Sequence, residues 1–274
     1  MKIKDIKELE SIANKVRLDI IEEVYSAKSG HPGGSLSIAD ILTVLYFNQM
    51  NIDEKNPKSP DRDRLVLSKG HCAPALYGVL AERGFFDKAE LKTLRHVGSI
   101  LQGHPDMKNI PGVDASTGSL GQGLSIANGM ALGSKLNKQG IRVYCICGDG
   151  EIQEGQIWEA AMTAAHYKLD NLCVVVDNNN LQIDGKVDEV MNIYPIDEKF
   201  ASFGFETINI DGHNIEEIIM AFEKAKKTKG KPTVIIANTI KGKGVSFMED
   251  KAEWHGKAPN EEQYNEAITE LTKN

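Results

Sequence analysis

The sequence predicts an α/β fold in which helices cover both faces of a parallel β-sheet. Two apolar runs, residues 141–147 and 172–176, are rich in β-branched residues, as buried parallel strands are. The alanine-rich segment 154–167 between them is typical of a helix, so the three segments form a β-α-β unit. Helical and strand patterns continue to alternate beyond residue 185. We therefore expect a single domain over residues 1–274 with one sheet at its centre.

The other expected elements follow in order along the chain. Residues 6–28 place apolar side chains at three- and four-residue steps, which indicates an amphipathic helix. Ser37 as the N-cap, with Asp40 three residues on, predicts a second helix over residues 37–47. The remaining elements are a strand at 65–67, helices at 73–83 and after 120, a helix at 194–203, a strand at 205–210, a helix at 215–226, a strand at 233–237 and a C-terminal helix.

Two of the expected helices carry stripes of small residues. The stripes are Gly121, Ser125, Gly129 and Gly133 in one helix, and Ala160, Ala161, Ala164 and Ala165 in the other. Such helices either lie tightly on their own sheet or face a second subunit. Because a ligand held at strand ends needs a second wall, we expect both stripes to form part of a surface that meets a partner.

Composition excludes several classes of protein. The net charge of −7 argues against a nucleic-acid partner, and no apolar run is long enough to span a membrane. The N-terminus is charged and has no signal-peptide core, and the four cysteines follow no disulfide pattern, so we expect a cytoplasmic protein with reduced thiols. Cys145 and Cys147 share a strand face and could bind a metal, but they are better interpreted as small core residues.

Polar residues follow the two buried strands of the β-α-β unit. Gly148-Asp149-Gly150 ends the first strand and Asp177-Asn178-Asn179 ends the second. The carboxyl ends of neighbouring parallel strands lie together, and open α/β sheets bind ligands there. Asp149 offers a carboxylate, Asn179 an amide oxygen and Leu181 a backbone carbonyl. These hard oxygen ligands predict a Mg²⁺ or Ca²⁺ site with positions left for phosphate oxygens.

Four of the seven histidines, His31, His71, His104 and His255, lie in loops bounded by glycine or proline. Glycine neighbours expose an imidazole ring and let a ligand approach it. Histidine can donate a hydrogen bond to phosphate and can transfer protons near neutral pH. A lone histidine in a loop is usually solvated, but four in this setting are unusual, so we interpret them as candidates for contact with a substrate or a phosphate group.

Short phrases of sequence between residues 29 and 256 carry a family resemblance. They are SGHPGGSLSIADIL, LSKGHCAPALYGVL, GHPD, TGSLGQGLSIANGMA, GDGEIQEGQIWEA, DNNNLQIDG and WHG. Together they resemble the transketolase family of thiamine diphosphate-dependent enzymes, over nearly the whole chain. The GDG motif with an Asn pair about thirty residues on is similar to the thiamine diphosphate and metal motif of such enzymes. The resemblance implies the thiamine diphosphate-binding fold of the pyrophosphate-binding type.

The resemblance also implies a role for individual residues. The implied metal ligands are Asp149, Asn179 and the Leu181 carbonyl, with Mg²⁺ as the expected ion. The residues implied to contact thiamine diphosphate are His71, Gly118, Leu120, Gly150, Asn179 and His255, of which Gly118 and Leu120 approach the aminopyrimidine through backbone groups. The residues implied to be catalytic are His31, His104 and His255, which face the donor sugar, and Glu154, which joins a carboxylate network across a subunit interface.

A full-length transketolase continues into a pyrimidine-binding domain and a third domain, and this sequence ends at Asn274. The resemblance therefore implies the N-terminal subunit of a split transketolase. With a C-terminal subunit, in an α2β2 heterotetramer, it would transfer a two-carbon ketol unit from a ketose phosphate to an aldose phosphate. The pathway is either the pentose phosphate pathway or a dedicated catabolic route of carbohydrate metabolism.

Three rival interpretations remain. The first is half of a deoxyxylulose-phosphate synthase-like thiamine enzyme, although the SGHPGG and GHPD loops favour transketolase. The second is a binding or regulatory subunit without activity, which need not have kept Asp149, Asn179 and all the loop histidines. The third is a metal hydrolase built on the histidines, for which no HExxH motif or paired ligand spacing is present.

Overall fold

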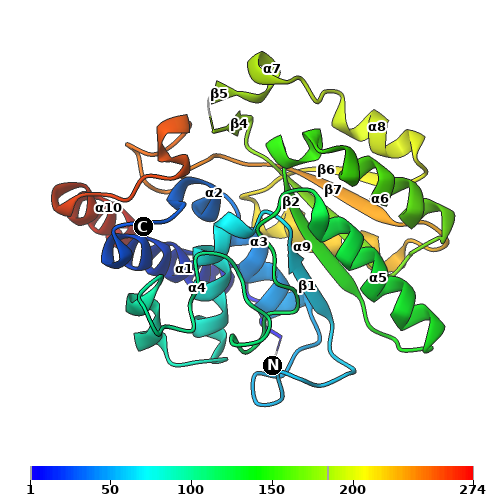
Figure 1. Cartoon of the computed structure of the whole chain (residues 1–274), viewed down its shortest axis with the longest axis horizontal. Helices are drawn as coiled ribbons and strands as arrows, with labels where there is room; N and C mark the ends of the chain where they lie inside the picture. The colour runs from blue at the N-terminus through cyan, green and yellow to red at the C-terminus, as the bar shows by residue number, and fades with distance from the viewer. Residues whose placement is uncertain (1, 184, 274) are drawn as a thin grey trace.

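The described part of the chain, residues 2–183 and 185–273 of a computed structural model, is built around a five-stranded parallel sheet (Figure 1). The strands lie in the order β1 (Arg64–Leu67), β2 (Val143–Gly148), β3 (Leu172–Asn178), β7 (Thr233–Asn238) and β6 (Glu206–Asp211). All neighbouring strands are parallel. The expected α/β fold with a parallel sheet is confirmed.

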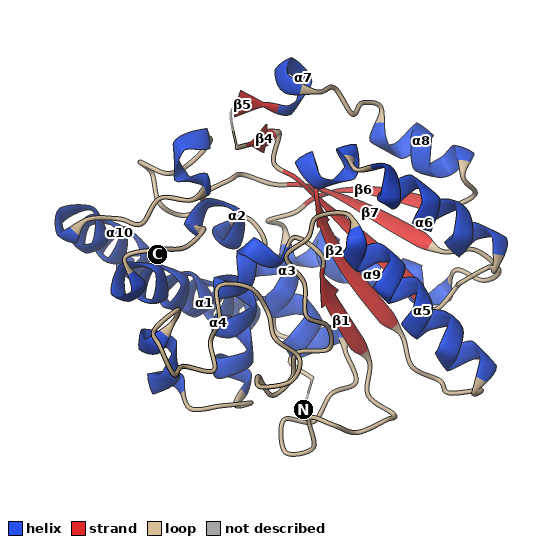
Figure 2. Cartoon of the chain, viewed as in Figure 1, coloured by secondary structure: helices blue, strands red, loops and turns tan. Residues whose placement is uncertain are grey.

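Helices cover both faces of this sheet (Figure 2). Alternate residues of each strand enter opposite cores, so that Tyr144 and Ile146 lie in one core and Cys145 and Cys147 in the other. The first core also contains residues of α1 (Ile6–Ala27), α3 (Ala39–Val44), α4 (Ala73–Arg83), α9 (Ile215–Lys227) and α10 (Glu261–Lys273). The second core contains residues of α5 (Gln122–Leu136), α6 (Gly155–His166) and α8 (Ile196–Ser202).

Short elements make up much of the remaining connections. They are α2 (Pro32–Leu36), the π-helical turn η1 (Leu45–Gln49), the 3-10 turns η2 (Gly70–Cys72), η3 (Lys88–Thr93), η4 (Gly150–Gln153) and η5 (Ala252–His255), the hairpin of β4 (Leu181–Gln182) and β5 (Gly185–Lys186), and α7 (Val187–Val190). The expected helix over 37–47 is wrong at its start. Ser37 does not cap it, because the Ser37 hydroxyl donates to Asp177 at 2.7 Å. The segment instead forms two short helices, α2 and α3, with Ser37 and Ile38 between them.

The two stripes of small residues behave differently. Ala160, Ala161 and Ala164 of α6 are buried in the core of the chain itself, so the expectation that they meet a partner is wrong. At Gly129 and Gly133 of α5, by contrast, an added Cβ would meet no described atom within 4 Å. Gly129 and Gly133 thus leave room for another surface, whereas Gly121 of the same stripe is packed against Glu154 and the alanines of α6 pack on the sheet.

The four cysteines of the chain lie in its interior. All four cysteines are free and buried, and Cys145 and Cys147 lie in the core with 3.8 Å between their sulfurs. Within the described residues, no group of three or more His, Cys, Asp or Glu side chains is arranged to hold a metal ion. None of the described helices has the length and apolar character needed to cross a membrane.

Candidate functional site

A cavity of about 240 Å³ opens at the carboxyl ends of β1, β2 and β3. The residues that line it are His31, Gly34, Lys69, His71, Gly118, Leu120, Gly148, Asp149, Gly150, Glu151, Asn179, Leu181, Gln182, Ile183, Lys241 and His255. Segments from distant parts of the sequence meet here because the strands are parallel and their following loops share one edge. The cavity thus lies at the strand ends where the sequence predicts a site.

The three expected metal ligands come together in the wall of this cavity. Asp149 is buried directly after β2, and its carboxylate accepts hydrogen bonds from the amides of Gly150 at 2.7 Å and Asn180 at 2.5 Å. Burial, and then the charge of Asp177, raises the pKa of Asp149 to about 7. A cation bound by Asp149, Asn179 and the Leu181 carbonyl would relieve this cost, so the donor set fits a hard divalent ion.

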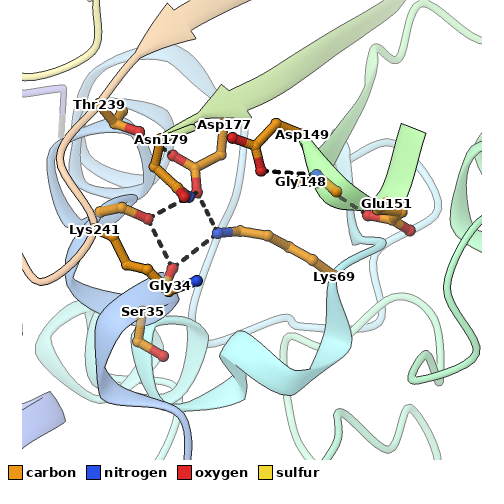
Figure 3. Close-up of polar contacts among 12 residues, drawn as sticks. Gly34, Ser35, Lys69, Gly148, Asp149, Glu151, Asp177, Asn179, Thr239 and Lys241 are labelled. Atoms are coloured by element: carbon orange, nitrogen blue, oxygen red, sulfur yellow. Dashed lines mark hydrogen bonds and ion pairs between the residues drawn. The ribbon is translucent and has the colours of Figure 1, made fainter. Parts of the chain in front are cut away.

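A buried ion pair, which the sequence did not reveal, lies next to the expected metal ligands (Figure 3). Lys69 and Asp177 are 2% and 0% exposed, and the Lys69 Nζ lies 2.5 Å from the Asp177 carboxylate. Asp177 also accepts from Ser37, Thr239 and, at 2.8 Å, the Asn179 amide, which fixes the orientation of that side chain. Burial alone would raise the pKa of Asp177, but Lys69 and the hydroxyl donors hold it below its usual value.

Three of the loop histidines gather at the opposite wall. The ring centroids of His31, His71 and His255 lie between 5.0 and 5.4 Å from one another. Burial lowers the pKa of His31 to about 4 and the pKa values of His71 and His255 to about 3, so all three rings are neutral at pH 7. Lys241 is buried beside them, with its Nζ 3.2 Å from the Nδ1 of His255. Burial lowers the pKa of Lys241 too, against the pull of Asp149.

The cavity fits an anionic group such as a diphosphate. The Nδ1 of His31 and the Nε2 of Gln182 are buried and have no hydrogen-bond partner among the described residues. Glycine lets the backbone pack closely in the wall, since a Cβ on Gly34 would lie 2.8 Å from the sulfur of Cys72, and one on Gly150 would lie 3.0 Å from the Cβ of Gln182. Unpaired donors, a buried ammonium and close backbone together favour negative charge.

Two expected catalytic residues lie beside the cavity and do not line it. His104 packs against Gly118, where an added Cβ would lie 3.0 Å from the His104 ring. Partial burial, and then the charge of Arg95, lowers the pKa of His104. Glu154 is exposed and precedes α6, with its Cβ against Gly121. The other expected site residues all line the cavity.

Sequence reasoning missed Lys69, Lys241, Glu151 and Gln182. Lys69 lies two residues before His71, and that spacing alone could have indicated it. Lys241 belongs to the GKG loop, which lacks the rest of a nucleotide-binding pattern and therefore suggests no role. The structure brings the Lys241 ammonium to the cavity, 3.3 Å from the Leu181 carbonyl. No local signal marks Glu151 or Gln182.

Comparison with known proteins gives consistent results. Residues 9–273 match the family model described as "Transketolase, thiamine diphosphate binding domain". The chain is 48% identical over 266 residues to the 6-deoxy-6-sulfo-D-fructose transketolase subunit SqwG of Clostridium sp. (strain MSTE9), covering 97% of each chain. It is 45% identical to an apulose-4-phosphate transketolase subunit of Phocaeicola vulgatus, covering 97% of this chain and 94% of that one.

Full-length transketolases match over part of their length only. The chain is 45% identical to human transketolase over 269 residues but spans 42% of it. The crystal structure of transketolase from Campylobacter jejuni superimposes with a TM-score of 0.93 at 38% identity, covering 98% of this chain and 43% of that one. The similarity to these enzymes therefore concerns about two fifths of their length.

Proposed function

Because the chain belongs to the transketolase family and matches its thiamine diphosphate binding domain, we propose that it is the N-terminal subunit of a two-subunit transketolase. With its partner it transfers a two-carbon ketol unit from a ketose to an aldose. The observation that carries this proposal is the cavity in which a hard-cation donor set faces neutral histidines and a buried ammonium. Two relatives that match nearly end to end are themselves named as transketolase subunits, which supports a separate partner chain.

Thiamine diphosphate, when bound, supplies the carbon nucleophile and the electron sink of the reaction. In this proposal Asp149, Asn179 and the Leu181 carbonyl hold Mg²⁺, and Ca²⁺ would satisfy the same oxygen ligands. Three side chains donate to the diphosphate in this proposal: the neutral rings of His71 and His255, and Lys241, whose ammonium also offsets its charge. The residues assigned to the rest of the cofactor are Gly150, whose amide would have to turn from Asp149 to reach the diphosphate, and Gly118 and Leu120, whose backbone would approach the aminopyrimidine.

The remaining histidines act on the sugar. His31 and His255 are neutral and their rings lie 5.4 Å apart, so each can donate a hydrogen bond to a hydroxyl group or accept one from it at neutral pH. His104 completes this group from beside Gly118. Glu154 is exposed in the isolated chain, which suits a carboxylate that meets the partner subunit.

The substrates and the partner are proposed from the relatives. One relative is named for a sulfo-sugar and another for a sugar phosphate, so we propose an anionic sugar as substrate and favour a dedicated catabolic route over the pentose phosphate pathway. The partner would carry the pyrimidine-binding and C-terminal domains and assemble with this chain into an α2β2 heterotetramer. The open glycines of α5 suit its contact surface. Free buried cysteines suit a cytoplasmic location.

The test is reconstitution of the two subunits. We expect no ketol transfer from the chain alone at saturating thiamine diphosphate and Mg²⁺, and transfer once the co-expressed partner is added. Omitting either thiamine diphosphate or the divalent ion should abolish it. Robust turnover by the chain alone would refute the two-subunit proposal, and product formation from pyruvate and glyceraldehyde phosphate would favour the deoxyxylulose-phosphate synthase alternative.

A further inference from the structure

Glu151 is a buried carboxylate that the proposed chemistry does not use. It forms no ion pair with a described cation, yet it is 3% exposed and lines the cavity beside Gly148 (Figure 3). One carboxylate oxygen accepts hydrogen bonds from the hydroxyl of Ser68 and, at 2.9 Å, from the amide of Gly121. The other oxygen accepts from the amide of Gly148 at 3.0 Å.

These three donors belong to three different segments that build the cavity. Ser68 follows β1 and precedes Lys69 and His71. Gly148 ends β2 next to Asp149. Gly121 closes the 117–121 loop, whose Gly118 and Leu120 line the cavity. A single side chain therefore joins the edge that faces the diphosphate to the loop proposed to face the aminopyrimidine.

The packing around this carboxylate leaves the 117–121 loop little freedom. An added Cβ on Gly70 would lie 2.8 Å from the amide nitrogen of Gly118, and one on Gly123 would collide with Ser68. The hydroxyl of Thr117 donates to the carbonyl of Leu67 at 2.7 Å. The loop is thus pressed against the end of β1 on one side, and Glu151 holds it on the other.

This arrangement needs an acceptor at both terminal atoms of the Glu151 side chain. A carboxylate accepts at both oxygens, whereas a carboxamide must place an NH₂ group at one of them. That NH₂ would face the amide N–H of either Gly121 or Gly148, because both are fixed donors. The hydroxyl of Ser68 can turn and accept from the NH₂ group, whereas no acceptor adjoins the oxygen bonded by Gly148 among these contacts. The NH₂ group therefore takes the position beside Ser68, Gly148 keeps an oxygen, and the buried amide of Gly121 loses its acceptor.

We propose that Glu151 is a positioning residue that sets the backbone of residues 117–121 against the diphosphate end of the cavity. It thereby places Gly118 and Leu120 for the aminopyrimidine half of thiamine diphosphate. The proposal rests on the proposed function. It concerns the half of the cofactor that lies away from the metal ligands, and this makes its effect separable from theirs.

The test compares two ligands on the complex of the chain with its partner subunit. Inorganic diphosphate with Mg²⁺ occupies only the diphosphate end, whereas thiamine diphosphate with Mg²⁺ needs both ends. For Glu151→Gln we expect affinity for thiamine diphosphate, measured by calorimetry, to fall by about tenfold or more, and affinity for inorganic diphosphate to stay within about twofold. Glu262→Gln, an exposed glutamate on α10, is the matched control and should change neither.

The outcomes separate the ideas involved. An equal loss of affinity for both ligands would mean that Glu151 stabilises the fold or the diphosphate end of the cavity, and would refute the proposal. An unchanged affinity for thiamine diphosphate would refute any positioning role for Glu151. If Glu151→Gln fails to fold, Ser68→Ala, which deletes one donor and keeps the carboxylate, should show a smaller loss confined to thiamine diphosphate; an equal or absent loss would overturn the proposal. Failure of the unaltered complex to bind thiamine diphosphate would instead refute the proposed function.

Discussion

Replacing His71 by asparagine should make the protein less sensitive to acid. His71 lies in the cavity wall among Lys69, Lys241 and two other imidazoles, and burial lowers its pKa from 6.5 to about 3. Between pH 7 and pH 5 the folded protein keeps His71 neutral while the unfolded chain protonates it. The unfolded state therefore binds more protons over this range, and the free energy of unfolding falls as the pH falls.

The size of the effect follows from these two pKa values. With an unfolded pKa of 6.5 and a folded pKa of about 3, lowering the pH from 7 to 5 costs the native state about 2 kcal/mol through His71 alone. For a chain of this size that corresponds to about 4 °C or more in the unfolding midpoint. Other groups titrate in the same range. The informative quantity is therefore the difference between His71→Asn and the unaltered protein in how the free energy of unfolding depends on pH.

The measurement is denaturant unfolding of the full chain at pH 7, 6 and 5. Between pH 7 and pH 5, the free energy of unfolding of His71→Asn should fall by about 2 kcal/mol less than that of the unaltered protein. His96→Asn removes an exposed histidine and should keep the original pH dependence, because its imidazole is hydrated in both states. Mg²⁺ with inorganic diphosphate should reduce the difference, since a bound anion favours the imidazolium. Identical pH dependence of the variant and the unaltered chain would refute the reasoning.

Two further predictions concern residues outside the cavity lining. His104→Asn should lower ketol-transfer turnover of the reconstituted enzyme by about 10²-fold or more while thiamine diphosphate affinity stays within about twofold, and an equal loss of affinity would place His104 on the cofactor instead. Glu23→Leu should raise the free energy of unfolding by about 1–3 kcal/mol, because both carboxyl oxygens are buried without a partner among the described residues. Burial, and then Asp19, raises the pKa of Glu23 well above normal, so the native state loses stability as pH rises and the gain should be larger at pH 8 than at pH 5; a gain that shrinks with rising pH would contradict this.

The sheet and the helices around the diphosphate-binding motif could be predicted because their signals are local. The runs at 141–147 and 172–176 lie in strands buried on both faces, so they are almost entirely apolar and the pattern needs no knowledge of the neighbours. The break of the second helix could not be predicted in the same way. Ser37 has the chemistry of an N-cap, but its hydroxyl donates a hydrogen bond to Asp177, which lies 140 residues away in the sequence.

In the candidate site, too, residues with local sequence signals could be predicted and residues with distant partners could not. Asp149, Asn179 and the loop histidines were found because short motifs surround them and because strand ends converge in a parallel sheet. Lys69 and Lys241 were missed because their contacts, Asp177 for Lys69 and the Leu181 carbonyl and His255 for Lys241, are brought close only by folding. The small residues of α5 and α6 look equivalent in sequence, and only the position of the sheet decides which of them is already covered.

The charges of the cavity explain how an acidic chain can hold an anionic cofactor. The net charge is −7, yet two buried ammonium groups, those of Lys69 and Lys241, lie at the cavity. The charge of Lys69 is neutralised by Asp177, so Lys69 orients the side chains around Asp177 more than it attracts an anion. Lys241 has no such close carboxylate among its described contacts, and burial already lowers its pKa. An anion placed beside Lys241 would therefore gain most from it, so we propose that Lys241, and not Lys69, is the ammonium that compensates the diphosphate.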